Sequence, residues 1–171
     1  MPQQNHMESE FLKAYENYAD ALFRHCFFRI HDHEHAKDLV QETYMKTWNY
    51  LAEDGTIDNF RAFLYRTMNN LIIDAYRKHH TDSLDQLLEG GFDVAGEDAE
   101  HLRNKAEAKE IIALFDQLNE EEKTVLTLRF VDGWEPKEIA AHLGISANVV
   151  SVRIHRALSE VRSLLHVTSN I

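Results

Sequence analysis

Apolar residues recur at intervals of three or four along three segments of the first eighty residues. The first segment runs from Phe11 to Ile30 and is interrupted by His31-Asp32-His33. The second begins near Glu34 and ends around Glu53-Asp54-Gly55, where the glycine is expected to adopt the left-handed conformation that terminates a helix. The third follows Asp58 or Asn59, either of which can cap a helix, and reaches Tyr76. Three amphipathic helices with short connections predict a compact N-terminal bundle.

The last sixty residues carry a second helical set. Ile111/Ile112, Leu114/Phe115 and Leu118 indicate one helix, and Asn119 then precedes Glu120-Glu121-Glu122, a cap followed by acids that favour a helix N-terminus. That helix is expected to continue to about Val131 and to end at Asp132-Gly133. No alternating run is long enough for a sheet, so the sequence predicts an all-α protein.

The segment from Glu135 to Ser146 has proline in the first helical turn, glycine just past the last, and serine as the cap of a final helix. A short helix, a glycine-containing turn and a longer capped helix form the helix-turn-helix arrangement. The final helix is expected to bury Val150, Ile154, Ala157/Leu158, Val161 and Leu164/Leu165. This leaves an outward set, predicted to contact DNA bases and phosphates: Asn148, Val149, Ser151, Val152, Arg153, His155 and Arg156. An ordinary helical hairpin is the alternative interpretation.

Charge is unevenly distributed along the chain. The 171 residues include 29 acidic and 18 basic side chains, a formal net charge of −11 that, evenly spread, would argue against nucleic-acid binding. Residues 81–100 hold seven acids, no lysine or arginine, and three of the six glycines, which is typical of a linker. Residues 60–80 (four bases, one acid) and 145–171 (three bases, one acid) are locally basic. We therefore expect two small helical domains, residues 1–80 and 108–171, joined by an acidic flexible linker over 81–107.

Several classes of protein are not expected. A single cysteine, Cys26, excludes an intramolecular disulfide and CxxC motifs, and its apolar neighbours place it in the core. The polar start and the lack of about 18 successive apolar residues predict a cytoplasmic protein without membrane insertion. No Ser/His/Asp spacing, Walker loop or GxGxxG occurs, so neither catalysis nor a cofactor is expected.

The third predicted helix mixes aromatic, amide and basic groups. Rings that stack on bases and cations that follow the backbone are typical of single-strand binding. The residues concerned are Arg61, Tyr65, Arg66, Asn69, Asn70, Tyr76, Arg77 and Lys78. In the alternative interpretation, Tyr65 and Tyr76 pack at the edge of the bundle and the bases are simply solvated.

Segments in both halves of the chain resemble one known family, the extracytoplasmic-function (ECF) subgroup of bacterial sigma factors. Residues 38–48 (DLVQETYMKTW) resemble the core-polymerase-binding helix of region 2, and residues 60–70 (FRAFLYRTMNN) resemble its promoter-melting, minus-ten-reading helix. Residues 126–133 (LTLRFVDG), followed by 138–158, resemble the minus-thirty-five reader of region 4.

The resemblance implies partners and residue roles. Asp38, Gln41, Glu42 and Lys46 would dock on the β′ clamp helices of RNA polymerase core, and region 4 would rest on the β flap. A loop at residues 52–59, with Asp54, Gly55, Thr56 and Asn59, would hold a flipped base, since a stacked base hides its edge. Arg61, Tyr65, Arg66, Asn69, Asn70, Arg77 and Lys78 would hold the opened strand. The linker would thread toward the active-site cleft, and an anti-sigma factor would cover the binding faces.

The chain also departs from the family pattern. Phe63 stands where the family commonly has Trp, Asn69 where it has Arg, and Val149-Val150-Ser151-Val152 where it has Thr-Val-Lys-Ser. Without that lysine, we expect weaker minus-thirty-five binding and a salt dependence lower by about one charge.

A second hypothesis rests on the eleven histidines. His31-Asp32-His33-Glu34-His35 suits zinc or nickel by ligand type, although alternate residues on a turn converge on one ion only if the backbone bends for it. In this alternative the protein is a free-standing helix-turn-helix regulator with a histidine-rich metal-sensing site. Such a regulator has no need for the 38–48 helix or for an acidic tether.

Overall fold

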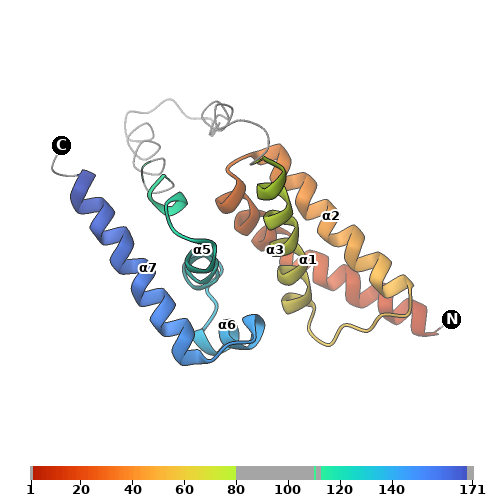
Figure 1. The fold of residues 1–171 in the computed structure, drawn as a ribbon. Helices are drawn as coiled ribbons and strands as arrows, with labels where there is room; N and C mark the ends of the chain where they lie inside the picture. The colour runs from red at the N-terminus through yellow and green to blue at the C-terminus, as the bar shows by residue number, and fades with distance from the viewer. Residues whose placement is uncertain (1, 80–109, 111–112, 169–171) are drawn as a thin grey trace. The chain divides into compact units, whose positions relative to one another are not determined.

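The computed structural model describes residues 2–79, 110 and 113–168, and divides the chain into two compact units, residues 1–91 and 92–171 (Figure 1). Every element of the described residues is a helix, which confirms the all-α prediction. The predicted linker over 81–107, and Ile111/Ile112, lie outside the described residues.

The first unit is a bundle of three helices, α1 (Pro2–Ile30), α2 (His33–Ala52) and α3 (Phe60–His79), each of which contacts the other two. Asp32 caps α2 by accepting a 2.7 Å hydrogen bond from the backbone N–H of His35, and Asn59 caps α3 by accepting one of 3.0 Å from Ala62. Asn59 is one of the two predicted caps of α3 and is confirmed, whereas Asp32 was expected only to interrupt the helical pattern. The start of α1 also differs from the prediction, because the helix begins at Pro2 and not near Phe11. The core contains side chains with no exposed surface: Leu22, Cys26, Leu64, Met68 and Ile72. Each apolar side chain of this size stabilises the fold by about 1.5–3 kcal/mol when buried.

The core of this unit also holds polar groups, which bond to nearby backbone. Thr43 and Thr47 donate to the carbonyls of Leu39 and Thr43, each at 2.8 Å, and the Tyr76 hydroxyl donates to the carbonyl of Arg29. Burial raises the pKa of the Cys26 thiol to about 12, so this cysteine is a protonated core residue at physiological pH, as predicted.

The end of α2 differs from the prediction. Asp54, and not Gly55, takes the left-handed conformation, with φ of 63°. Gly55 is required for a different reason: its N–H donates to the carbonyl of Tyr50 at 2.9 Å, and an added Cβ would lie only 2.3 Å from that oxygen. The glycine therefore supplies room for a close backbone approach, which periodicity does not reveal.

The second unit contains α5 (Glu120–Leu126), the π-helical turn η1 (Thr127–Val131), α6 (Pro136–Leu143) and α7 (Ala147–Thr168). Asn119 and Glu122 form a reciprocal capping box at the start of α5. The predicted single helix to Val131 widens at η1, where the Asp132 N–H reaches the Thr127 carbonyl. The loop after it folds back, because the N–H of Trp134 donates to the Leu128 carbonyl at 2.9 Å and the Trp134 side chain is buried.

The helix-turn-helix forms as predicted. Pro136 begins α6, Gly144 ends it with φ of 67°, and Ser146 caps α7 by accepting from the Val149 N–H at 3.2 Å. Val150 and Ala157 are fully buried. Leu165 was expected to face inward, but 40% of its surface is exposed. Successive residues are about 100° apart around a helix, so Leu164 and Leu165 do not both point toward the same packing face.

Candidate functional site

The outer face of α2 presents the predicted polymerase-docking residues to solvent. Asp38, Gln41, Glu42 and Lys46 are all exposed, and an i,i+4 ion pair of 3.7 Å joins Glu42 to Lys46. Met45, which sequence reasoning did not select, lies among them with 58% of its surface exposed. Methionine is enriched at protein–protein interfaces, so its exposure here fits a protein-binding face.

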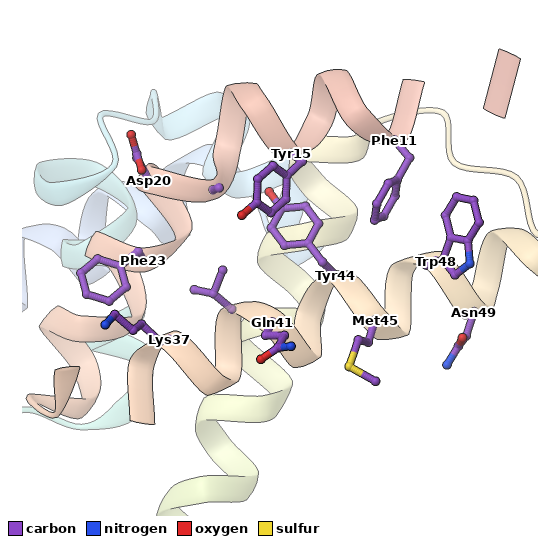
Figure 2. Close-up of a pocket in the computed structure, with 12 residues that line it drawn as sticks. Phe11, Tyr15, Asp20, Phe23, Lys37, Gln41, Tyr44, Met45, Trp48 and Asn49 are labelled. Atoms are coloured by element: carbon purple, nitrogen blue, oxygen red, sulfur yellow. The ribbon is translucent and has the colours of Figure 1, made fainter. Parts of the chain in front are cut away.

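A groove of about 700 Å³ runs between α1 and α2 beside this face (Figure 2). Phe11 and Tyr15 from α1 point toward Tyr44 and Trp48 from α2, with ring centroids 5.1 Å apart for Phe11 and Trp48 and 4.9 Å apart for Tyr15 and Tyr44. The Tyr44 hydroxyl donates to the carbonyl of Ala14 at 3.3 Å, and burial raises its pKa. Gln41 and Met45 line the same groove, so it continues the outer face of α2.

The loop between α2 and α3 contains four residues predicted to hold a flipped base. Asp54, Thr56 and Asn59 are exposed, and Gly55 is partly exposed. Gly55 lies against the ring of Tyr50, which is 43% exposed and stands 5.0 Å from the ring of Phe63. Sequence reasoning missed Tyr50; its position in the last turn of α2, just before the loop, was the available signal.

Replacement of Gly55 by alanine is expected to destabilise the first unit by about 2–3 kcal/mol, because the new methyl group meets a backbone oxygen that cannot move aside alone. Gly144→Ala is the matched control: its φ is also unfavourable for alanine, but no atom lies within 4 Å, and about 1 kcal/mol is expected. Urea unfolding followed by circular dichroism measures both. A Gly55→Ala protein as stable as the wild type would contradict the steric argument.

The exposed face of α3 carries most of the predicted strand-binding residues. Arg66, Asn70, Arg77 and Lys78 are exposed, whereas Arg61 and Asn69 are partly exposed. Asp74 forms an ion pair of 3.8 Å with Arg77, so part of the local positive charge is compensated.

Tyr65 does not belong to this face. It is 2% exposed, and its ring packs edge-on against His25 at 5.1 Å. The prediction that Tyr65 stacks on a base is therefore wrong, because it occupies the inner side of α3 with Met68 and Ile72. The alternative interpretation, that Tyr65 packs against the bundle, is the better one, although the ring lies in the core and not at the edge that was expected.

The N-terminal half of α7 presents the predicted reading residues. Asn148, Val149, Ser151, Val152, His155 and Arg156 are exposed, and Val149 and Val152 retain 39% and 41% of their surface as expected. Arg153 is partly covered, because its Nη2 forms a 2.9 Å ion pair with Oε2 of Glu121 on α5. A hollow of about 360 Å³ between these helices includes Asn119, Glu121 and Arg156. The triple-glutamate segment was interpreted only as a helix start, and its contact with the reading helix depends on tertiary packing.

Among residues 2–79, 110 and 113–168, no group of three or more His, Cys, Asp or Glu side chains could hold a metal ion. In the same residues no helix is long and apolar enough to cross a membrane.

Comparisons with known proteins connect these surfaces to a family. The sequence model of Sigma-70 region 2 matches residues 14–81, and that of Sigma-70 region 4 matches residues 108–161. The chain belongs to the ECF sigma factors. It is 28% identical over 165 residues to the ECF RNA polymerase sigma factor SigX of Bacillus subtilis, covering 91% of this chain and 84% of the relative. It is 29% identical over 164 residues to SigL of Mycobacterium tuberculosis, covering 92% and 90%.

Solved structures share the sigma-factor fold. CnrH, determined in complex with the cytosolic domain of CnrY, superposes with a TM-score of 0.69 at 24% identity, covering 94% of this sigma factor and 90% of that chain. The sigma factor RpoE of Bartonella quintana, determined with the anti-sigma factor NepR, gives 0.66 at 23% identity, covering 92% and 98%. This sigma factor is a transcription initiation factor that directs RNA polymerase to promoters, and the metal-sensing regulator is not favoured.

Proposed function

We propose that the sigma factor binds polymerase core through the outer face of α2, reads the minus-ten element with the 52–59 loop and α3, and reads the minus-thirty-five element with α7. The main support for this proposal is that the Sigma-70 region 2 model matches the first compact unit and the region 4 model matches the second. The exposure of Asp38, Gln41 and Glu42 supports the first contact, and that of Arg66 and Arg156 supports the other two. The protein acts in the cytoplasm with polymerase and has no catalytic activity of its own.

The distribution of charge predicts how tightly the protein binds DNA alone. The segments around α3 and α7 carry formal charges of +3 (four bases, one acid) and +2 (three bases, one acid), and ion pairs engage Arg77 and Arg153. Each phosphate contact contributes through one released counterion, so such a small number of cations gives weak binding. Core polymerase therefore supplies most of the electrostatic affinity.

An anti-sigma protein is the expected antagonist. Both CnrH and the Bartonella quintana RpoE were solved with such a partner or a cytosolic domain bound. The groove between α1 and α2 is lined mostly by aromatic and aliphatic side chains and adjoins the proposed core-binding face, which supports an antagonist that competes with polymerase there.

Transcription in vitro tests the proposal. Purified core polymerase, the sigma factor and fragments of genomic DNA should yield transcripts from specific start sites, and the sigma factor alone should bind the same fragments weakly. Absence of both core binding and specific transcripts would overturn the proposal. Tight binding without polymerase that is lost on addition of a chelator would instead support the metal-sensing regulator.

Replacement of Glu121 by glutamine is expected to strengthen binding of the holoenzyme to the minus-thirty-five duplex about three- to five-fold at low salt. The change removes the negative charge from the 2.9 Å ion pair and so weakens the hold on Arg153 next to the reading helix. The gain should shrink as salt rises, because exposed charges are screened. Fluorescence anisotropy with a promoter fragment from the transcription assay measures it. Glu160→Gln, an exposed acid farther along α7, is the control, and weaker binding by Glu121→Gln would show that Glu121 instead orients Arg153 for DNA.

A further inference from the structure

A buried histidine reaches across the first unit to a residue of the proposed strand-binding face. His25 on α1 has no exposed surface, and its Nε2 lies 2.9 Å from Oδ1 of Asn69 on α3, 44 residues away. The edge-on ring of Tyr65 packs against the imidazole. Burying a polar group without a hydrogen bond lowers the stability of the fold. Breaking this contact is therefore unfavourable, and the contact holds both side chains in place.

The chemistry of the pair determines which atoms face each other. An amide oxygen only accepts, so the imidazole carries its proton on Nε2 and donates it to Asn69 Oδ1. Oxygen and nitrogen occupy opposite branches of the planar amide. Engaging the oxygen at His25 therefore directs the two N–H donors of Asn69 away from the core.

Asn69 stands at the boundary of the exposed face of α3. Its neighbours on one side, Tyr65 and Met68, are buried, whereas Arg66 and Asn70 are exposed. Asn69 is itself partly exposed, so its side chain lies between the core and the exposed face of α3.

We propose that His25 is a positioning residue for promoter recognition: it fixes the amide of Asn69 so that Asn69 presents hydrogen-bond donors, and selects an unpaired base that offers an acceptor edge. This rests on the proposed function of α3 in binding the opened strand. An arginine or lysine can only donate, but an asparagine donates or accepts according to its orientation. Bases are distinguished by the pattern of donors and acceptors on their edges, so an amide free to rotate would read that pattern poorly.

The test uses holoenzyme and a forked promoter DNA whose non-template strand is unpaired over the minus-ten segment. Each unpaired position carries each of the four bases in turn, and dissociation constants are measured by fluorescence anisotropy. Asn69→Ala should lose a preference of about three- to ten-fold at one position, as expected for one hydrogen bond. His25→Phe, which keeps an aromatic ring but no donor, should lose the same preference at the same position. His25→Gln, whose amide can donate from near the position of Nε2, should restore it.

A second variant keeps the test decisive if His25→Phe unfolds, as judged by thermal denaturation. Asn69→Asp still accepts from His25 but places an oxygen where the amine stood, so it should lose the preference for acceptor edges while folding normally. The inference would be overturned if folded His25→Phe protein, or Asn69→Asp protein, kept the wild-type base preference. It would also be overturned if Asn69→Ala changed the preference at no position. Transcription by the wild-type holoenzyme distinguishes a failure of this inference from a failure of the proposed function. If the wild-type holoenzyme makes no promoter-specific transcripts, the proposed function itself is contradicted.

Discussion

Reversing the charge of Glu42 to arginine is expected to weaken binding of the sigma factor to polymerase core at least 30-fold, about 2 kcal/mol, with a parallel loss of promoter-specific transcripts. Glu42 lies exposed between Gln41 and Met45 on the outer face of α2. At the centre of an interface, a reversed charge replaces an attraction by a repulsion and leaves the partner's charge unpaired. Its intrahelical pair with Lys46 at 3.7 Å is exposed and contributes well under 1 kcal/mol to folding, so the fold should survive.

Glu16→Arg is the matched control for this experiment. It makes the same change of charge at an exposed position of α1 that is outside the predicted docking set. Core binding measured by fluorescence anisotropy with labelled sigma factor should be unchanged for this variant within two-fold. Equal losses for Glu16→Arg and Glu42→Arg would indicate a general effect of net charge and would contradict a specific docking face.

Replacement of Tyr65 by alanine is expected to destabilise the first unit by about 3–5 kcal/mol, since it removes a large buried ring and leaves a cavity. In a unit of this size, such a loss lowers the melting temperature by about 12 °C or more. Tyr65→Phe keeps the ring and should cost about 1 kcal/mol or less. Differential scanning calorimetry measures both variants.

The same two variants distinguish a core residue from a base-stacking one. If Tyr65 packs inside the bundle, Tyr65→Phe holoenzyme should bind forked promoter DNA as the wild type does, and Tyr65→Ala should lose binding only as far as it loses folded protein. A stable Tyr65→Ala protein with a selective loss of strand binding would restore the stacking interpretation and would contradict the burial of this ring. Arg66→Ala, at the neighbouring exposed position, should show that selective loss.

Local patterns predicted the helical segments and the caps at Asn59, Asn119 and Ser146, because these features depend on residues a few positions apart. The first helix begins at Pro2 and not near Phe11, and the cap at Asp32 was not predicted. Asp32, Asn59, Asn119 and Ser146 each accept from a backbone N–H three residues later, and such contacts are readable from the sequence alone. Gly144 was likewise predictable, since it ends a periodic run just before a cap. Each of the segments that resemble sigma regions 2 and 4 is likewise a short contiguous stretch of sequence.

The sequence by itself therefore determined the all-α class, the helix-turn-helix and the family. Tertiary structure decided which side of α3 carries Tyr65, why residue 55 must be glycine, and that Glu121 pairs with Arg153. It also brought His25 to Asn69 across 44 residues. These contacts join separate helices, and their geometry depends on how the helices pack; a period of 3.6 residues defines a face of one helix but not the side chains that another helix places against it.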